Sequence, residues 1–279
     1  MKLRLYHHPD GARIAYREAG TGPPLALLHS AGLTHREWEP VVDELAHRYR
    51  VVLPDLPLHG ASEDRPTHPY SPDWLTEVLA GFLLDTCGAR PLVAGHGLGA
   101  QLALLATAKG EIQPAKLVLL PNPMHTKPRR GGLERAGRVV VRAAVVPGVD
   151  RVLARSAALV LRPSRGDRLT ATAAPGARDL VRHALMDLGG NGNRVRSWAK
   201  AARRWPRGAQ RDLIDAYPGF TFPVLLLWAD EDAVHSPAIA EEALELLPDA
   251  QLRVLKRTGF LVAYDDPVGL AREILAFCG

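Results

Sequence analysis

The chain has 279 residues, of which 47% are hydrophobic, enough to bury a sizeable core in one domain that carries an insertion. Its two cysteines, Cys87 and Cys278, are too few for a disulfide framework. The first residues contain no apolar secretion signal, and no apolar run approaches the roughly 20 residues that span a bilayer. The sequence therefore predicts a cytoplasmic protein without a membrane segment.

The net charge of +5 is unevenly distributed along the chain. Residues 125–211 contain 20 Lys and Arg but only 5 Asp and Glu, so the remainder of the chain is acidic. Two interpretations stay open: the charge attracts an acidic, phosphorylated or carrier-bound ligand, or it is a solvated arginine-rich surface. Because no nucleic-acid-binding motif accompanies the charge, a nucleic-acid partner is not expected.

Short apolar runs alternate with longer helical patterns, which is typical of a mostly parallel sheet covered on both faces. Ser71 and Pro72 are an N-cap and a first-turn proline, and Thr34 with Glu37 has the spacing of a capping box. We expect eight strands at residues 3–6, 13–17, 25–29, 50–53, 91–94, 116–120, 224–228 and 251–255, and helices at 34–47, 71–87, 100–109, 237–247 and 267–277.

The pattern of short apolar runs that predicts strands stops after the sixth strand and returns only near residue 224. Between them the sequence is rich in Arg, Ala and Val, and Val139–Val146 and Val152–Leu161 have apolar helical patterns. We therefore expect a core of residues 1–124 and 212–279, with residues 125–211 as a basic helical lid. In open α/β sheets such an insertion covers the ligand crevice at the carboxyl ends of the strands.

Five segments in this order resemble the α/β-hydrolase superfamily, in its esterase, enol-lactonase and epoxide-hydrolase branch. They are the oxyanion loop at 27–32, an Asp-x-x-x-His-Gly-x-Ser loop at 55–62, the nucleophile elbow at 95–99, the acid-bearing strand end at 228–234, and the histidine loop at 257–260. The resemblance covers residues 1–124 and 220–279. It implies an α/β-hydrolase fold with an eight-stranded sheet and an active site at these loops.

The sequence departs from the family pattern at two of the three catalytic positions. The elbow has Gly97 in place of the nucleophile, and the histidine position holds Phe260. Acyl-enzyme catalysis needs a nucleophile, a base that takes its proton, and a group that orients the base. Only the acid, Asp232, remains. We therefore do not expect ordinary serine-hydrolase chemistry.

The resemblance implies that the oxyanion hole is retained although the catalytic triad is not. Glycine relieves the strain of the elbow, so its shape should persist. The backbone N–H groups of Leu98 and Ala31 would then form the hole and stabilise an enolate, phenolate or carbonyl oxygen. Ser30 either binds a substrate oxygen or bonds loop backbone, while Gly97 leaves room beside the hole and Phe260 makes it more apolar.

Two further polar residues are candidates for acid–base catalysis. Asp232 is either a carboxyl group with a raised pKa in an apolar cavity or a turn residue that accepts backbone N–H groups. His125 follows the sixth strand and either faces the crevice as a base or packs against the lid. His96 and His235 are weaker candidates, with packing behind the elbow the favoured role for His96. No metal-ligand or nucleotide-binding motif occurs, so neither a metal nor a cofactor is expected.

The sequence favours a cofactor-independent, non-hydrolytic enzyme that acts on an apolar, oxygen-rich small molecule. Addition, elimination, cyclisation or C–C bond formation would proceed at the oxyanion donors, and natural-product tailoring would suit the composition. Two alternatives stay open: an inactive ligand-binding pseudohydrolase, and a hydrolase that uses His125 or Asp232 to activate water.

Overall fold

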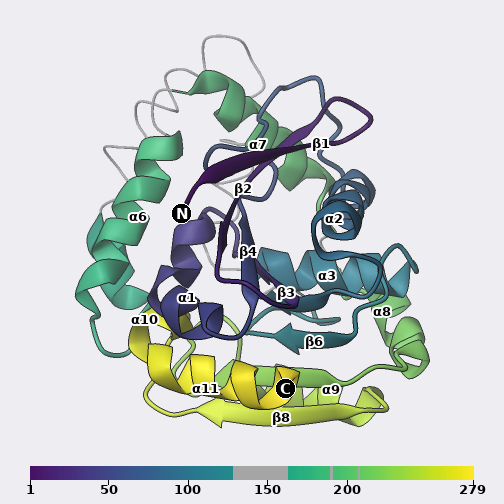
Figure 1. The fold of residues 1–279 in the computed structure, drawn as a ribbon, viewed down its shortest axis with the longest axis vertical. Helices are drawn as coiled ribbons and strands as arrows, with labels where there is room; N and C mark the ends of the chain where they lie inside the picture. Colours follow the sequence, from purple (N-terminus) through teal and green to yellow (C-terminus); the bar gives the residue numbers. More distant parts are fainter. Residues whose placement is uncertain (128–162, 189–190, 207) are drawn as a thin grey trace.

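The computed structural model describes residues 1–127, 163–188, 191–206 and 208–279. Its centre is an eight-stranded sheet in the order β1-β2-β4-β3-β5-β6-β7-β8 (Figure 1). β2 pairs antiparallel with β1 and β4, and all other neighbouring strands are parallel. The predicted fold class, a mostly parallel eight-stranded α/β sheet, is confirmed.

The strands are β1 (Leu3–His7), β2 (Arg13–Ala19), β3 (Pro24–Leu28), β4 (Arg50–Pro54), β5 (Leu92–Gly95), β6 (Lys116–Leu119), β7 (Val224–Ala229) and β8 (Ala250–Leu255). The α-helices of the core are α1 (Glu39–Ala46), α2 (Pro72–Cys87), α3 (Leu98–Ala108), α8 (Arg211–Ala216), α9 (Pro237–Leu246), α10 (Val262–Asp265) and α11 (Pro267–Cys278), with 3-10 turns η1 (His35–Trp38) and η3 (Tyr217–Gly219). The predicted strands all form, with ends that differ by one or two residues.

Helices cover both faces of the sheet, as the nearly continuous burial of its central strands requires. One apolar layer lies between the sheet and α2, α3, α8 and α9. The second layer lies between the sheet and α1, α10 and α11. Because the two layers hold the strands rigidly, the loops at the carboxyl ends of β3, β5, β6 and β7 meet in fixed positions.

The predicted helix over residues 34–47 is wrong in one respect, because the chain forms η1 first and begins α1 only at Glu39. Pro40 lies in the first turn of α1, where its fixed φ and missing N–H suit a new helix start. Thr34 caps η1 by accepting a hydrogen bond from the N–H of Arg36 at 3.3 Å. The Glu37 side chain does not complete the capping box and instead turns into the protein interior, where it is 3% exposed.

The described part of the basic segment, residues 125–211, contains η2 (Pro163–Arg168), α6 (Pro175–Leu188) and α7 (Gly192–Arg204). The predicted apolar helices Val139–Val146 and Val152–Leu161 lie outside the described residues. The loop between η2 and α6 is fixed to the core because Asp265 accepts hydrogen bonds from the N–H groups of Ala171 and Thr172, each at 2.8 Å.

Several cations of α7 are used to hold the loop at residues 60–69. Arg194 forms an ion pair with Asp64 at 3.2 Å and donates to the carbonyl of Gly60 at 2.8 Å. Lys200 donates to the carbonyls of Pro66 at 3.0 Å and His68 at 2.5 Å. Arg194 and Lys200 therefore bind groups within the protein. Neither interpretation of the basic charge predicted this role.

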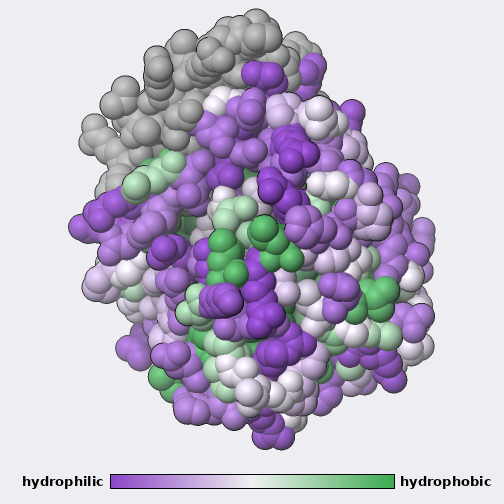
Figure 2. All heavy atoms as spheres, turned by 45° about the horizontal axis from the view of Figure 1, so that its top comes forward, coloured by the Kyte–Doolittle hydropathy of each residue, from purple (hydrophilic) through white to green (hydrophobic). Residues whose placement is uncertain are grey.

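The face of the molecule in Figure 2 is largely hydrophilic where its residues are described, with hydrophobic side chains in small patches. The strongly exposed large apolar side chains include Met186 and Val268, which are far apart in the sequence, and Met1, Leu3 and Leu5 at the start of the chain. Within the described ranges no helix is long and apolar enough to cross a membrane.

Candidate active site

The nucleophile elbow is present in shape although its nucleophile is absent. β5 ends at Gly95 and α3 begins at Leu98, and Gly97 between them has φ +50° and ψ −112°. A side chain in such a conformation costs about 1–3 kcal/mol, which glycine largely avoids. The N–H of Gly97 donates to the carbonyl of Pro121 at 3.1 Å, and its own carbonyl accepts from Gln101 at 3.0 Å. Backbone hydrogen bonds therefore fix Gly97 on both sides.

Two backbone N–H groups beside the elbow have no acceptor. Within the described residues, neither the N–H of Leu98, at the start of α3, nor that of Ala31 donates a hydrogen bond. The first N–H groups of a helix have no partner inside the helix and are favourably placed for negative charge. These are the two donors that the family resemblance implied for the oxyanion hole.

Ser30 occupies the space that a side chain at position 97 would need. A Cβ atom added to Gly97 would lie 2.6 Å from the Cβ of Ser30 and 3.3 Å from its Cα. Such contacts are far shorter than the roughly 3.5–4.0 Å at which carbon atoms attract one another. The glycine at the elbow and the serine in the oxyanion loop therefore depend on each other.

Glu37 binds the oxyanion loop and the elbow at once. It accepts hydrogen bonds from the N–H of Ser30 at 2.7 Å and from the Ser30 hydroxyl, which is 2.8 and 2.9 Å from its two carboxylate oxygens. It also accepts from Nδ1 of His96, the residue before Gly97. All three side chains are almost fully buried. Sequence reasoning missed this role of Glu37, because the residue matched a capping box.

The surroundings of Glu37 determine its protonation state. Burial by itself would raise the pKa of this carboxyl, but the nearby His96 and the hydrogen bonds from His96 and Ser30 outweigh it and lower the pKa. Glu37 is therefore an ionised acceptor at neutral pH. An ionised carboxylate can only accept hydrogen bonds, so it holds a proton on Nδ1 of His96.

The second ring nitrogen of His96, Nε2, is buried and has no hydrogen-bond partner in the described part of the chain. The His96 ring lies next to that of Phe260, with 4.4 Å between the ring centroids. Phe260 stands at the position of the family's catalytic histidine. An imidazole thus lies beside that position, although it comes from the elbow and not from the histidine loop.

Asp232 fits the turn interpretation more closely than the catalytic one. Its Oδ1 accepts a hydrogen bond from the N–H of Val234 at 2.6 Å, as a turn residue does. Its Oδ2 lies 3.4 Å from Nδ1 of His235 without hydrogen-bond geometry. Phe260 also contacts the His235 ring, with 5.9 Å between the centroids. Asp232 and His235 therefore lie near Phe260, but no described contact joins them to His96.

His125 lies in a different environment from the one its sequence position indicated. Its ring packs edge-on against Tyr217 at a centroid distance of 5.7 Å. Its Nε2 lies 3.2 Å from a carboxylate oxygen of Glu242 on α9, and neither ring nitrogen forms a hydrogen bond of good geometry. No contact among the described residues connects His125 to the elbow.

The histidines of the fold motifs hold the loops around the elbow. His29 donates from Nδ1 to the carbonyl of Ser30 at 2.8 Å, and its Nε2 accepts from the N–H of Leu56 at 2.9 Å. His59 accepts from the N–H of Gly32 at 3.0 Å. Burial lowers the pKa of both histidines, and that of His59 falls to about 3, with His29 as the second cause. Both rings are therefore neutral structural groups.

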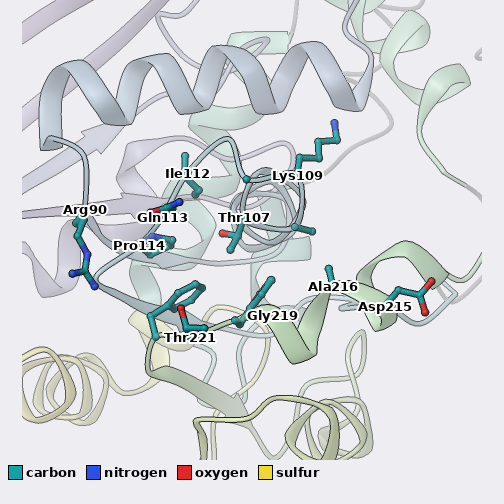
Figure 3. A pocket seen from close by; sticks show the side chains of 14 residues that line it. Arg90, Thr107, Lys109, Ile112, Gln113, Pro114, Asp215, Ala216, Gly219 and Thr221 are labelled. Atoms are coloured by element: carbon teal, nitrogen blue, oxygen red, sulfur yellow. The ribbon is translucent and has the colours of Figure 1, made fainter.

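A hollow of about 790 Å³ lies at the opposite end of the sheet (Figure 3). Its lining includes Arg90 and Pro114, which precede β5 and β6, and Thr221, which precedes β7. It is thus at the amino ends of the strands, away from the elbow, and it contains none of the buried unpartnered polar atoms. We do not regard it as the active site. In the described ranges no group of three or more His, Cys, Asp or Glu side chains could hold a metal ion.

The sheet, the elbow and the loops around it define an α/β-hydrolase-type domain. The chain belongs to the alpha/beta hydrolase family, whose model matches residues 25–273. It is 27% identical to an uncharacterized protein of Mycobacterium tuberculosis over 281 residues, which covers 96% of this chain and 77% of that protein. The predicted superfamily membership is confirmed.

One shorter similarity and one structural similarity are to proteins named esterases. A pimeloyl-[acyl-carrier protein] methyl ester esterase of Nitrosomonas europaea is 36% identical over 109 residues, or 39% of this chain and 41% of that protein. A thermophilic esterase of Thermogutta terrifontis has the same fold, with a TM-score of 0.76 and 20% identity over 100% of this chain and 98% of that one. At that identity, the second similarity shows the fold alone.

Proposed function

We propose that this protein is a cofactor-independent, non-hydrolytic enzyme that stabilises an oxyanion of an apolar, oxygen-rich small molecule. The observation that carries the proposal is the contact between Ser30 and Gly97. A side chain at position 97 would collide with Ser30, yet the N–H groups of Leu98 and Ala31 have no acceptor among the described residues. The site thus combines oxyanion donors with an occupied nucleophile position.

Such a donor pair suits reactions that pass through an enolate or a similar anion. Addition, elimination, cyclisation and C–C bond formation next to a carbonyl all develop negative charge on oxygen without a covalent enzyme intermediate. Loss of one oxyanion donor typically costs about 10²–10³-fold in rate. Phe260 and the apolar cluster of Leu33, Leu180 and Leu261 around it favour an apolar substrate.

The decisive variant removes one donor without disturbing the helix. Leu98 is the first residue of α3, where proline is tolerated because the N–H has no helical partner. Leu98→Pro deletes that N–H, while Leu98→Ala deletes the same side chain and keeps the N–H. We expect turnover of an enolisable ketone such as deoxybenzoin, followed as α-proton exchange in D₂O, to be about 10²–10³-fold slower in Leu98→Pro than in Leu98→Ala. Equal rates for the two variants would refute the oxyanion role.

A relocated hydrolase is the second candidate, and the position of Ser30 favours it. Its hydroxyl is bonded to Glu37 and lies 3.5 Å from Nδ1 of His96, so a hydroxyl, an imidazole and a carboxylate are grouped together. The esterase names of the similar proteins agree with this candidate. Hydrolysis of p-nitrophenyl esters by the parent protein, lost in Ser30→Ala, would establish it and would contradict the non-hydrolytic proposal.

A binding protein without turnover is the remaining alternative. It would bind deoxybenzoin or an ester in a calorimetric titration but would produce neither proton exchange nor hydrolysis. That result would also contradict the proposed function.

A further inference from the structure

We infer that His96, oriented by Glu37, is the proton-transfer residue of this site and replaces the histidine that the family carries at position 260. This inference deepens the proposed function and rests on it. It gives a catalytic role to a histidine that the sequence placed behind the elbow, and it makes Glu37 the positioning residue.

The orientation of the imidazole is the first argument. Glu37 accepts from Nδ1 of His96, and the same carboxylate is held by the N–H and the hydroxyl of Ser30. A carboxylate that fixes Nδ1–H leaves the lone pair on Nε2, as in the histidine of a hydrolytic triad. Its second nitrogen is therefore prepared to accept a proton.

The location of the imidazole is the second argument. His96 is joined directly to Gly97, and the donor Leu98 follows. Its ring lies 4.4 Å from that of Phe260, which occupies the place of the family's base. The base is thus replaced by the imidazole at position 96, with its carboxylate at position 37.

The unpartnered state of Nε2 is the third argument. Nε2 of His96 is buried without a hydrogen bond, and the whole residue is 1% exposed. A buried polar atom without a partner costs about 1–3 kcal/mol. His29 and His59 satisfy both ring nitrogens. His68, His125 and His235 also have unpartnered buried nitrogens among the described residues, so the free Nε2 of His96 supports the inference only together with its oriented Nδ1 and its place beside Phe260.

The chemical step is a proton transfer at carbon. Nε2 of His96 takes the proton next to the substrate carbonyl, and the C–H electron pair forms the enolate C=C bond. The enolate oxygen accepts hydrogen bonds from the N–H groups of Leu98 and Ala31. The proton on Nε2 then returns to carbon, which gives exchange or isomerisation, or passes to a leaving group, which gives elimination.

The first experiment determines the tautomer and does not depend on turnover. Two-bond ¹H–¹⁵N correlation spectra of the ¹⁵N-labelled protein identify the protonated nitrogen of each imidazole, and the spectrum of His96→Gln assigns the His96 signals. We expect the neutral imidazole of His96 in the parent to have its proton on Nδ1 and a bare Nε2, and we expect loss of this single tautomer in Glu37→Gln. A proton on Nε2 in the resting protein would overturn the inference.

The second experiment measures α-proton exchange of deoxybenzoin in D₂O. We expect His96→Gln to slow exchange by about 10²-fold or more, while His47→Gln, a change of an exposed histidine after α1, leaves it unchanged. Exchange by the parent that survives in His96→Gln would refute the role of His96 but not the oxyanion chemistry. Exchange that is lost on substitution of Asp232 or His125, but not of His96, would also refute the role of His96. If the parent protein catalyses no exchange, the result counts against the proposed function. The tautomer of His96, measured in the first experiment, still tests the inference.

Discussion

Replacement of Gly97 by alanine should destabilise the protein for two separable reasons. The new Cβ would lie 2.6 Å from the Cβ of Ser30, and the residue would have to keep a φ of +50°. Overpacking of this kind costs about 1–3 kcal/mol, and the unfavourable backbone conformation adds about 1–3 kcal/mol. We therefore expect Gly97→Ala to lower the free energy of unfolding by about 2–6 kcal/mol.

A double-mutant cycle separates the two contributions. Ser30→Gly removes the side chain that the new Cβ would meet, so it relieves the overlap but not the backbone strain. We expect a coupling free energy of about 1–3 kcal/mol between Gly97→Ala and Ser30→Gly. The four proteins are compared by urea unfolding, with the free energy extrapolated to water and the slope checked for constancy.

A matched glycine measures the backbone contribution alone. Gly11 also has a positive φ, +87°, but a Cβ added there would meet no atom within 4 Å. Gly11→Ala should therefore destabilise less than Gly97→Ala and should show no coupling to Ser30→Gly. A coupling below about 0.5 kcal/mol between positions 30 and 97 would refute the interdependence of these residues. It would also remove the main observation behind the proposed function.

Two further predictions concern the loops that surround the site. The pKa of His59 in the folded protein is about 3, below its unfolded value of about 6.5. The stability that its neutral ring contributes is therefore complete above a pH of about 6.5. That stability is lost as the pH falls toward 3. His59→Gln should flatten the fall of unfolding free energy between pH 6 and 4 by up to about 1.4 kcal/mol per pH unit, whereas His47→Gln should not. Arg194→Ala, which breaks the buried ion pair with Asp64, should destabilise by about 1.5–3 kcal/mol in urea unfolding. Arg182→Ala, which changes an exposed residue, should lower the free energy of unfolding by less than about 1 kcal/mol. Equal effects of the two variants would contradict the role of α7 in holding the loop at residues 60–69.

The fold could be predicted from the sequence because its signals are local and repeated. The central strands β3, β5 and β7 are short apolar runs, and Ser71 with Pro72 begins α2 as predicted. The order of the loop motifs then identified the superfamily. The same reasoning placed Gly97, Leu98 and Ala31 together, since a parallel sheet brings these loops to one edge.

The acid–base pair could not be predicted in the same way. Glu37 matched a capping box, and only the three-dimensional structure shows its side chain turning inward to Ser30 and His96. His125 follows a strand at the correct edge, but side-chain direction decides its role, and its ring turns toward Tyr217. One signal was present in the sequence. The family's oxyanion loop usually has glycine, but sometimes serine, at the position of Ser30, and its elbow has serine at the position of Gly97.

The contact between positions 30 and 97 connects the departures from the family pattern. Serine at position 97 would collide with Ser30, so the elbow cannot regain a nucleophile while the oxyanion loop keeps its hydroxyl. The hydroxyl in turn helps to hold Glu37, and Glu37 orients His96. With an imidazole already beside the elbow, position 260 holds an aromatic ring, whose centroid lies 4.4 Å from that of His96. Restoring a triad therefore requires changes at positions 30, 97 and 260 together, and Gly97→Ser with Phe260→His alone should remain inactive on p-nitrophenyl esters.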